Sequence, residues 1–278
     1  MGEAFAASPI FFEGTGQMKS LIGAVALAMV VAGSAAAQDD GFKLSGTVGV
    51  DYSTGDYGTG VDTDILMVPL GLRATTGPLR WTASLPYMRI EGAANVIGGG
   101  EGGPIIVDPD AGLERVTREG FGDLSLGAAY TLPQSMTGAF EVDLSGRVKL
   151  PTSDEDEGLS TGETDFSVGA EASYPLGAWT PFVGVGYRMP GDPEGIDLEN
   201  TFSASLGTSY TLTESSVLIF SYDYAQATTG SVEDAHELFA GYSAPLFGGV
   251  NWTLYGIAGL SEGSPDAEGG VLLSIPFN

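Results

Sequence analysis

Cysteine is absent from this chain of 278 residues, and basic residues and histidine are scarce. Without cysteine there is no disulfide framework, so a secreted chain of this kind must gain its rigidity from a sizeable core or from a membrane. Only 10 Lys and Arg stand against 36 Asp and Glu, giving a net charge of −26, which argues against a nucleic-acid partner. A mean hydropathy of +0.13 argues equally against an acidic, disordered chain.

Long hydrophobic runs are also absent, apart from one near the N-terminus. Lys19, the apolar stretch 21–32 and the small residues 35–37 form the pattern of a secretory signal peptide that is cleaved before Gln38. No later run is long enough for a transmembrane helix. We therefore expect three parts: an upstream extension at 1–17 that is not part of the mature protein, a signal peptide at 18–37 and one mature domain at 38–278.

Alternation of apolar and polar residues with period two is the main feature of the mature chain. In the segment 140–150, Val142 and Leu144 share one face while Asp143 and Arg147 share the other. Twelve such segments can be counted, at 42–52, 63–74, 79–90, 121–132, 138–150, 164–174, 180–189, 201–212, 216–227, 236–245, 250–260 and 269–277. Each is close to the ~9–11 residues that a tilted membrane strand requires.

The connections between these segments differ by parity. Those after odd segments (53–61, 92–119, 151–163, 190–200, 228–235 and 261–268) include the long ones and hold 20 Asp and Glu residues. Those after even segments are short and hold one acid, Glu214. In an up-and-down meander the two sets lie at opposite ends, as at the extracellular and periplasmic rims of an outer-membrane barrel. We predict an all-β fold, a twelve-stranded antiparallel up-and-down transmembrane β-barrel, with acidic extracellular loops and periplasmic termini.

Two stretches of the chain carry motifs. One is 120–130, with the pattern G-x-GD-x-x-LG-x-x-Y; the other is the K-x-PT hairpin at 149–152, followed by 158–162 and Asp165. These motifs resemble those of a family of outer-membrane transporters associated with meta-pathway degradation of phenol. The motif residues are Gly122, Asp123, Gly127, Tyr130, Lys149, Pro151, Thr152, Gly162 and Asp165. The resemblance implies a barrel and uptake of aromatic or other hydrophobic small molecules. The chain departs from the usual aromatic C-terminus of such barrels, because Asn278 follows Phe277.

The inward phase of the strands is the expected functional surface. Its charged candidates are Lys43, Arg73, Arg80, Asp123, Glu141, Asp143, Arg147, Lys149, Glu171, Arg188 and Asp223. Charges this dense in a narrow interior must be hydrated or paired, because an isolated buried charge is costly. Salt-bridge ladders across the fifth and sixth strands would meet that need. The pattern leaves open whether such a network only holds the wall or also selects solutes.

Catalysis and metal binding are not expected. The residue two positions after His236 is Leu238, so the His and Ser spacing of outer-membrane phospholipases is missing and no hydroxyl nucleophile is adjacent. The acidic runs 154–157 and 108–110 could hold Ca²⁺, but their spacing matches no EF-hand and acidic outer loops also serve solubility. We predict no enzyme activity, no cofactor and no metal site.

These observations predict a monomeric channel for passive uptake of small, aromatic or hydrophobic solutes in a Gram-negative outer membrane. The alternative is a non-conducting structural or adhesive surface barrel with acidic extracellular loops. Its expected partners are outer-membrane lipid, lipopolysaccharide, a small-molecule solute and the barrel-assembly machinery.

Overall fold

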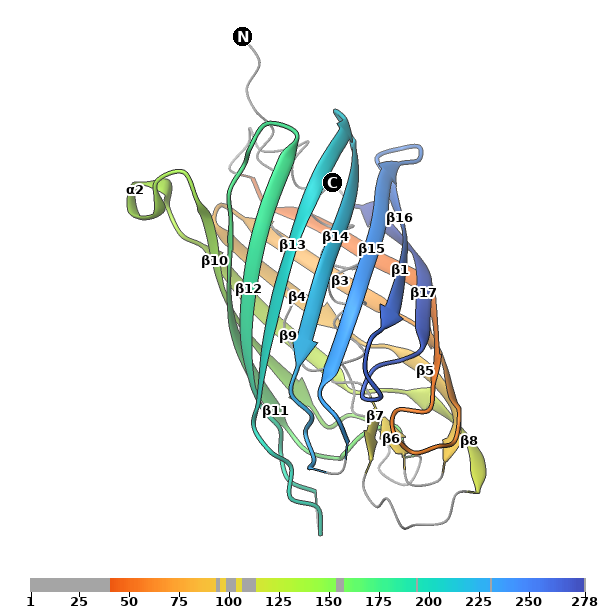
Figure 1. The fold of residues 1–278 in the computed structure, drawn as a ribbon. Coiled ribbons are helices and arrows are strands. Elements are labelled where there is room, and N and C mark those ends of the chain that lie inside the picture. The colour runs from red at the N-terminus through yellow and green to blue at the C-terminus, as the bar shows by residue number, and fades with distance from the viewer. Residues whose placement is uncertain are drawn as a thin grey trace.

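The chain folds into a closed antiparallel barrel (Figure 1). The computed structural model describes residues 41–277 apart from 94–95, 99–103, 107–113, 154–157, 194 and 231. The expected extension and signal peptide at 1–37 lie outside the described residues. The last strand pairs with the first, with Ser45 opposite Pro276, and this pairing closes the sheet. None of the helices in the described part of the chain has the length and hydropathy that a membrane crossing needs.

Nine strands cross the wall without interruption, each hydrogen-bonded to its sequence neighbours. They are β1 (Lys43–Gly55), β10 (Glu141–Leu150), β11 (Asp165–Ser173), β12 (Trp179–Met189), β13 (Thr201–Thr213), β14 (Ser216–Ala225), β15 (Ala235–Pro245), β16 (Asn251–Gly259) and β17 (Ala267–Pro276). The short connection before β10 contains the one-turn α2 (Gln134–Thr137), which begins directly after Pro133.

Three further strands cross the wall in two pieces each. They are β2 (Thr63–Val68) with β3 (Leu70–Thr76), β4 (Leu79–Ser84) with β5 (Tyr87–Ala93), and β8 (Arg115–Phe121) with β9 (Leu124–Thr131). Pro69 and Pro86 stand at two of the breaks, since proline cannot donate to a ladder. Gly122 stands at the third. A Cβ added there would lie 2.8 Å from the terminal methyl of Met88 and 3.1 Å from Pro86 Cγ, so the wall packs closely beside the second break.

The predicted fold class, a barrel of twelve strands, is thus confirmed, with corrections to individual strands. The segments 63–74, 79–90 and 121–132 were expected to be continuous, and the prolines and glycine above divide the pairing there. The range 92–119 was expected to be a connection, but β5 extends into it and β8 begins within it. It also contains the small hairpin of β6 (Val96–Gly98) and β7 (Pro104–Ile106).

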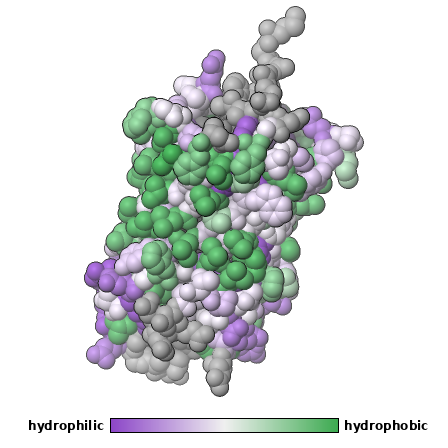
Figure 2. Space-filling view, turned by 180° about the vertical axis from the view of Figure 1, so that it is seen from behind, coloured by the Kyte–Doolittle hydropathy of each residue, from purple (hydrophilic) through white to green (hydrophobic). Residues whose placement is uncertain are grey.

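The outer and inner faces of the wall differ as the alternation predicts. On β10, Leu144 is 45% exposed, whereas Asp143 beside it is completely buried. Large apolar residues cover the outer face, and Figure 2 shows them across the middle of the visible side, with hydrophilic residues concentrated toward the two ends. A wall that is apolar on its outside and closed on itself leaves no sheet edge to be satisfied by water.

The interior holds polar residues together with one connected apolar cluster. Its members come from both halves of the barrel: Ile65, Met67, Met88, Ile90, Leu159, Phe182, Ile219, Phe239, Tyr255, Ile257 and Leu272. Leu159 lies in the connection between β10 and β11 and is fully buried, and its neighbours Ser160 and Thr161 are also buried, so this part of the connection packs into the barrel.

Candidate lumen site

The strand residues that were predicted to line the lumen occupy the inward phase of the wall. Six candidates are at most 4% exposed: Asp123, Asp143, Lys149, Glu171, Arg188 and Asp223. The other five, Lys43, Arg73, Arg80, Glu141 and Arg147, are partly buried. Charges so deeply removed from water need partners, and two separate networks supply them to Asp123, Lys149, Arg188 and Asp143.

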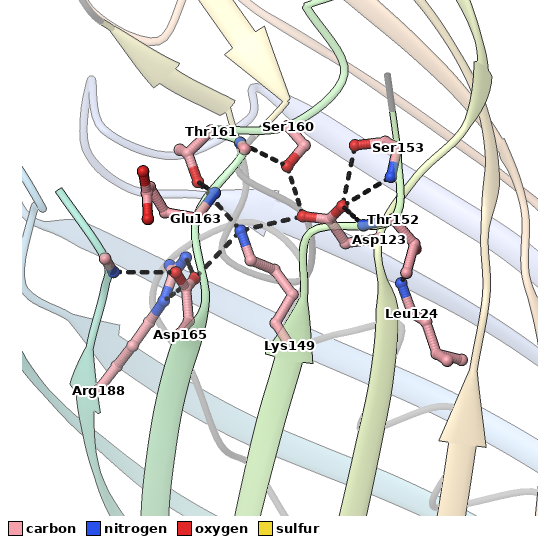
Figure 3. Close-up of polar contacts among 12 residues, drawn as sticks. Asp123, Leu124, Lys149, Thr152, Ser153, Ser160, Thr161, Glu163, Asp165 and Arg188 are labelled. Atoms are coloured by element: carbon pink, nitrogen blue, oxygen red, sulfur yellow. Dashed lines mark hydrogen bonds and ion pairs between the residues drawn. The ribbon is translucent and has the colours of Figure 1, made fainter. Parts of the chain in front are cut away.

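The first network centres on Lys149, near the end of β10 (Figure 3). Its Nζ lies 3.1 Å from Asp123 Oδ2 and 3.4 Å from Asp165 Oδ2, and it donates a 3.1 Å hydrogen bond to Thr161 Oγ1. Lys149 and Asp165 are direct cross-strand partners, so this is a salt bridge between the fifth and sixth crossing strands. One cation thereby holds two carboxylates from different strands.

Asp123 fastens the connection between β10 and β11 to the wall. Its Oδ1 accepts hydrogen bonds from Thr152 N at 3.0 Å, Ser153 N at 3.1 Å and Ser153 Oγ at 2.9 Å, while Ser160 Oγ donates to Oδ2. The break between β8 and β9 frees Asp123 from the ladder and allows this geometry. Desolvation of the buried carboxylate is offset by these donors together with Lys149.

Asp165 closes the network on its other side. Arg188 donates to Asp165 Oδ2 through Nε at 3.1 Å and also through Nη2, and Gly191 N donates to Oδ1 at 3.1 Å. Gly162 N donates to Ser160 Oγ at 3.0 Å, and its φ of 71° is one that favours glycine. The second family motif therefore encodes a tethered hairpin.

The remaining motif residues lie elsewhere. Thr152 Oγ1 accepts a 2.8 Å hydrogen bond from Leu124 N, and Pro151 precedes it at the exposed end of β10. Tyr130 is on the outer face, 40% exposed. Gly127 faces inward, where a Cβ would lie 2.6 Å from Thr82 Oγ1, so its role is close packing of β9 against β4.

The second network lies toward the opposite end of the barrel. Arg80 Nη2 is 2.5 Å from Asp143 Oδ2, and Thr131 Oγ1 donates to Asp143 Oδ1. Salt-bridge ladders were expected across the fifth and sixth strands, but the partner of Asp143 is Arg80, on the third crossing strand. A partner two strands away cannot be deduced from alternation, because the period gives the face of a residue and not the reach of a long side chain.

Sequence reasoning missed the apolar part of the inner face. Phe182, Ile219, Phe239 and Ile257 are at most 5% exposed, and all stand in the inward phase of β12 to β16. Continuing the alternation of 140–150 through these strands would have found them. Extended to β1 and β17, it would also have found three buried inward acids: Asp51, Glu237 and Glu268.

The single histidine is part of an aromatic cluster on the outer face of the wall. His236 Nδ1 lies 2.6 Å from Tyr222 Oη, and its ring centroid is 5.2 Å from that of Tyr224. Within the described ranges, no three His, Asp or Glu side chains are placed to hold a metal ion. The acidic runs 108–110 and 154–157 lie outside the described residues.

Comparison with known proteins identifies relatives in sequence and in fold. A family model described as "Putative MetA-pathway of phenol degradation" matches residues 71–255. The COG4313 outer membrane channel from Pseudomonas putida F1 has a TM-score of 0.66 at 16% identity, covering 84% of this chain and 95% of that chain. The translocator domain of the autotransporter NalP from Neisseria meningitidis has a TM-score of 0.51 at 14% identity, covering 90% and 94%. No curated protein matches the sequence. At such identities the two structures show the fold alone, an outer-membrane β-barrel.

Proposed function

This chain belongs to the family of the MetA pathway of phenol degradation, and on that premise we propose that it is an outer-membrane channel for small aromatic or hydrophobic solutes. The barrel crosses the membrane with its short turns in the periplasm and its long, acidic loops outside the cell. Such a protein contacts lipid and lipopolysaccharide, is inserted by the barrel-assembly machinery and works without a cofactor.

The apolar cluster on the inner face carries the proposal. A channel for hydrophilic solutes has a polar interior, whereas this wall places Phe182, Ile219 and Phe239 inward and buries them. Apolar and aromatic side chains give a hydrophobic solute contacts that are as favourable as those with lipid. The solute loses no hydrogen bonds when it makes these contacts. The charged networks stand beside the cluster and maintain the wall around it.

Uptake by intact cells tests the function. Gram-negative cells that express the chain should accumulate an apolar fluorescent aromatic faster than cells with an empty vector. Phe239→Ser should reduce this gain, because it places a hydroxyl in the apolar path. Phe220→Ser is the matched control, since Phe220 lies on the outer face and is 46% exposed.

Folding of both variants is verified by heat-modifiable gel migration, which a closed barrel shows in mild detergent. A barrel that inserts but gives no accumulation above the empty vector would contradict the channel and support a structural or adhesive surface barrel. A Phe220→Ser variant that loses as much uptake as Phe239→Ser would show that the inner face is not the path.

A further inference from the structure

A row of directly opposed residues crosses the inner wall from β10 to β15. Its members are, in order, Asp143, Glu171, Gly184, Ser205, Asp223 and Glu237. Asp143 is near the short-turn end of its strand and Glu237 near the long-loop end, so the row climbs through the barrel as the strands tilt. Acids oppose each other at Asp143–Glu171 and at Asp223–Glu237. Like charges directly opposite are destabilising, so the row calls for counter-charges.

Some positions of the row have a partner within hydrogen-bond distance, whereas Glu171 has only the longer-range attraction of Arg80 among the described residues. Asp143 is paired with Arg80, and Asp223 Oδ2 accepts a 2.7 Å hydrogen bond from Ser221 Oγ. Glu171 is only 2% exposed, and neither of its carboxylate oxygens has a hydrogen-bond partner among the described residues. A buried carboxylate without donors carries a large desolvation penalty, which a bound cation would offset.

Gly184 forms a cradle between Glu171 and Ser205, its two cross-strand partners. A Cβ on Gly184 would lie 2.5 Å from Ser205 Oγ and 3.8 Å from Glu171 Oε2, so both oxygens lie close to the place where a side chain would stand. Ser205 Oγ is also buried and without a hydrogen-bond partner among the described residues. A carboxylate and a hydroxyl thus converge on a position that glycine keeps open.

The chemistry of this cradle fits a single positive charge. One carboxylate and one hydroxyl suit an alkali ion or an ammonium group, and the absence of a metal-holding cluster in the described ranges does not favour a divalent chelate. Phe182, two residues before Gly184 on β12, turns its ring over Gly207 on the same inner face. An aromatic ring two residues along the same strand adds a surface that both cations and apolar groups contact favourably.

We propose that Glu171 and Ser205 bind a monovalent cation over Gly184, either an alkali ion or the ammonium group of an organic amine. This site makes the lumen cation-selective. The inference rests on the proposed channel function and names a ligand class for its inner wall.

Reversal potentials in planar bilayers test the site. Under a KCl gradient the wild-type protein should prefer K⁺ over Cl⁻, and Glu171→Gln should lower this permeability ratio by roughly two-fold or more. The variant should fold, because Gln keeps the size and shape of the side chain and removes a deeply buried charge. Glu119→Gln is the control: it makes the same charge change on an exposed position of β8. Gly184→Ala keeps all charges but fills the cradle, and it should reduce selectivity as Glu171→Gln does.

Hexylammonium added on one side distinguishes the two cation sources. If hexylammonium blocks the wild-type current in a concentration-dependent way and Glu171→Gln abolishes this block, the site binds organic amines as well as alkali ions. If the wild-type protein is cation-selective but is not blocked, the site binds alkali ions alone. Unchanged selectivity and block in both Glu171→Gln and Gly184→Ala would overturn the proposal.

A protein that inserts without conducting contradicts the channel, but it still tests the site. In that case the unfolding midpoint in detergent is compared in methylammonium chloride and in choline chloride. An unfolding midpoint that is higher in methylammonium chloride for the wild type, but not for Glu171→Gln, supports the site. Equal midpoints of the wild type in the two salts overturn it.

Discussion

Arg80 Nη2 lies 2.5 Å from Asp143 Oδ2, and this ion pair joins the third crossing strand to the fifth over the face of the fourth. Thr131, on the intervening strand β9, donates to the same carboxylate. Three neighbouring strands are therefore held at one point on the inner wall. The pair lies at the end of β4 and β9 that is farther from their breaks, where the ladder between the two strands is continuous.

Removing one partner of this pair is expected to be costly. Asp143→Ala should lower the free energy of unfolding by about 3–5 kcal/mol, because it removes the carboxylate that forms an ion pair with the largely buried guanidinium of Arg80. The double variant Arg80→Leu with Asp143→Leu should recover much of this loss. Reversible urea unfolding in lipid vesicles measures both. If the double variant is no more stable than Asp143→Ala, the pair does not carry the energy assigned to it.

The outward phase of β12 gives a second prediction. Val185 is at the middle of its strand and 43% exposed, so Val185→Arg should cost about 2–4 kcal/mol at the bilayer midplane. Met136→Arg is the control, since Met136 lies in α2 outside the wall and is 73% exposed. A similar cost for the two variants in the same unfolding assay would mean that this face does not meet lipid.

The faces of the strands could be predicted from the sequence because a strand has a period of two. Leu144 and Asp143 occupy opposite faces, as alternation requires, and the parity of the connections predicted which strand ends lie together. The breaks were not predicted, although Pro69 and Pro86 are visible in the sequence. Both halves keep the same phase across these two prolines, so a membrane strand of expected length conceals the breaks.

The partners within the site could be predicted only in part. Lys149 and Asp165 are cross-strand neighbours on the fifth and sixth strands, where salt-bridge ladders were expected. Asp123 joins them only because the ladder is broken beside it, and Arg80 reaches Asp143 across an intervening strand. Such contacts depend on side-chain reach and local backbone geometry. The apolar inner cluster was missed for a different reason: attention to charged residues passed over inward positions such as Phe239.

The lysine between two carboxylates gives a third prediction. Lys149→Met should release the connection at 151–164, because Asp123 and Asp165 lose the cation that they share. Limited proteolysis within this connection should become faster while the heat-modifiable barrel persists. Arg89→Met is the control, since the Arg89–Glu91 pair is exposed and such pairs contribute about 0–1 kcal/mol. Equal protease resistance in wild type and Lys149→Met would show that the tether does not depend on this charge.

The orientation of the barrel gives the last prediction, and the absence of cysteine makes it straightforward to test. Asp192 lies in the connection between β12 and β13, and Ser135 lies in α2 at the opposite end of the wall. If the long, acidic loops are extracellular, a bulky, membrane-impermeant thiol probe should label Asp192→Cys on intact cells and label Ser135→Cys only after lysis. Both side chains are at exposed or partly exposed positions, so burial does not account for a difference between them. Labelling of Ser135→Cys alone on intact cells would mean that the barrel is inserted the other way round, with its short turns outside; equal labelling would mean that the two connections do not lie on opposite sides of a membrane.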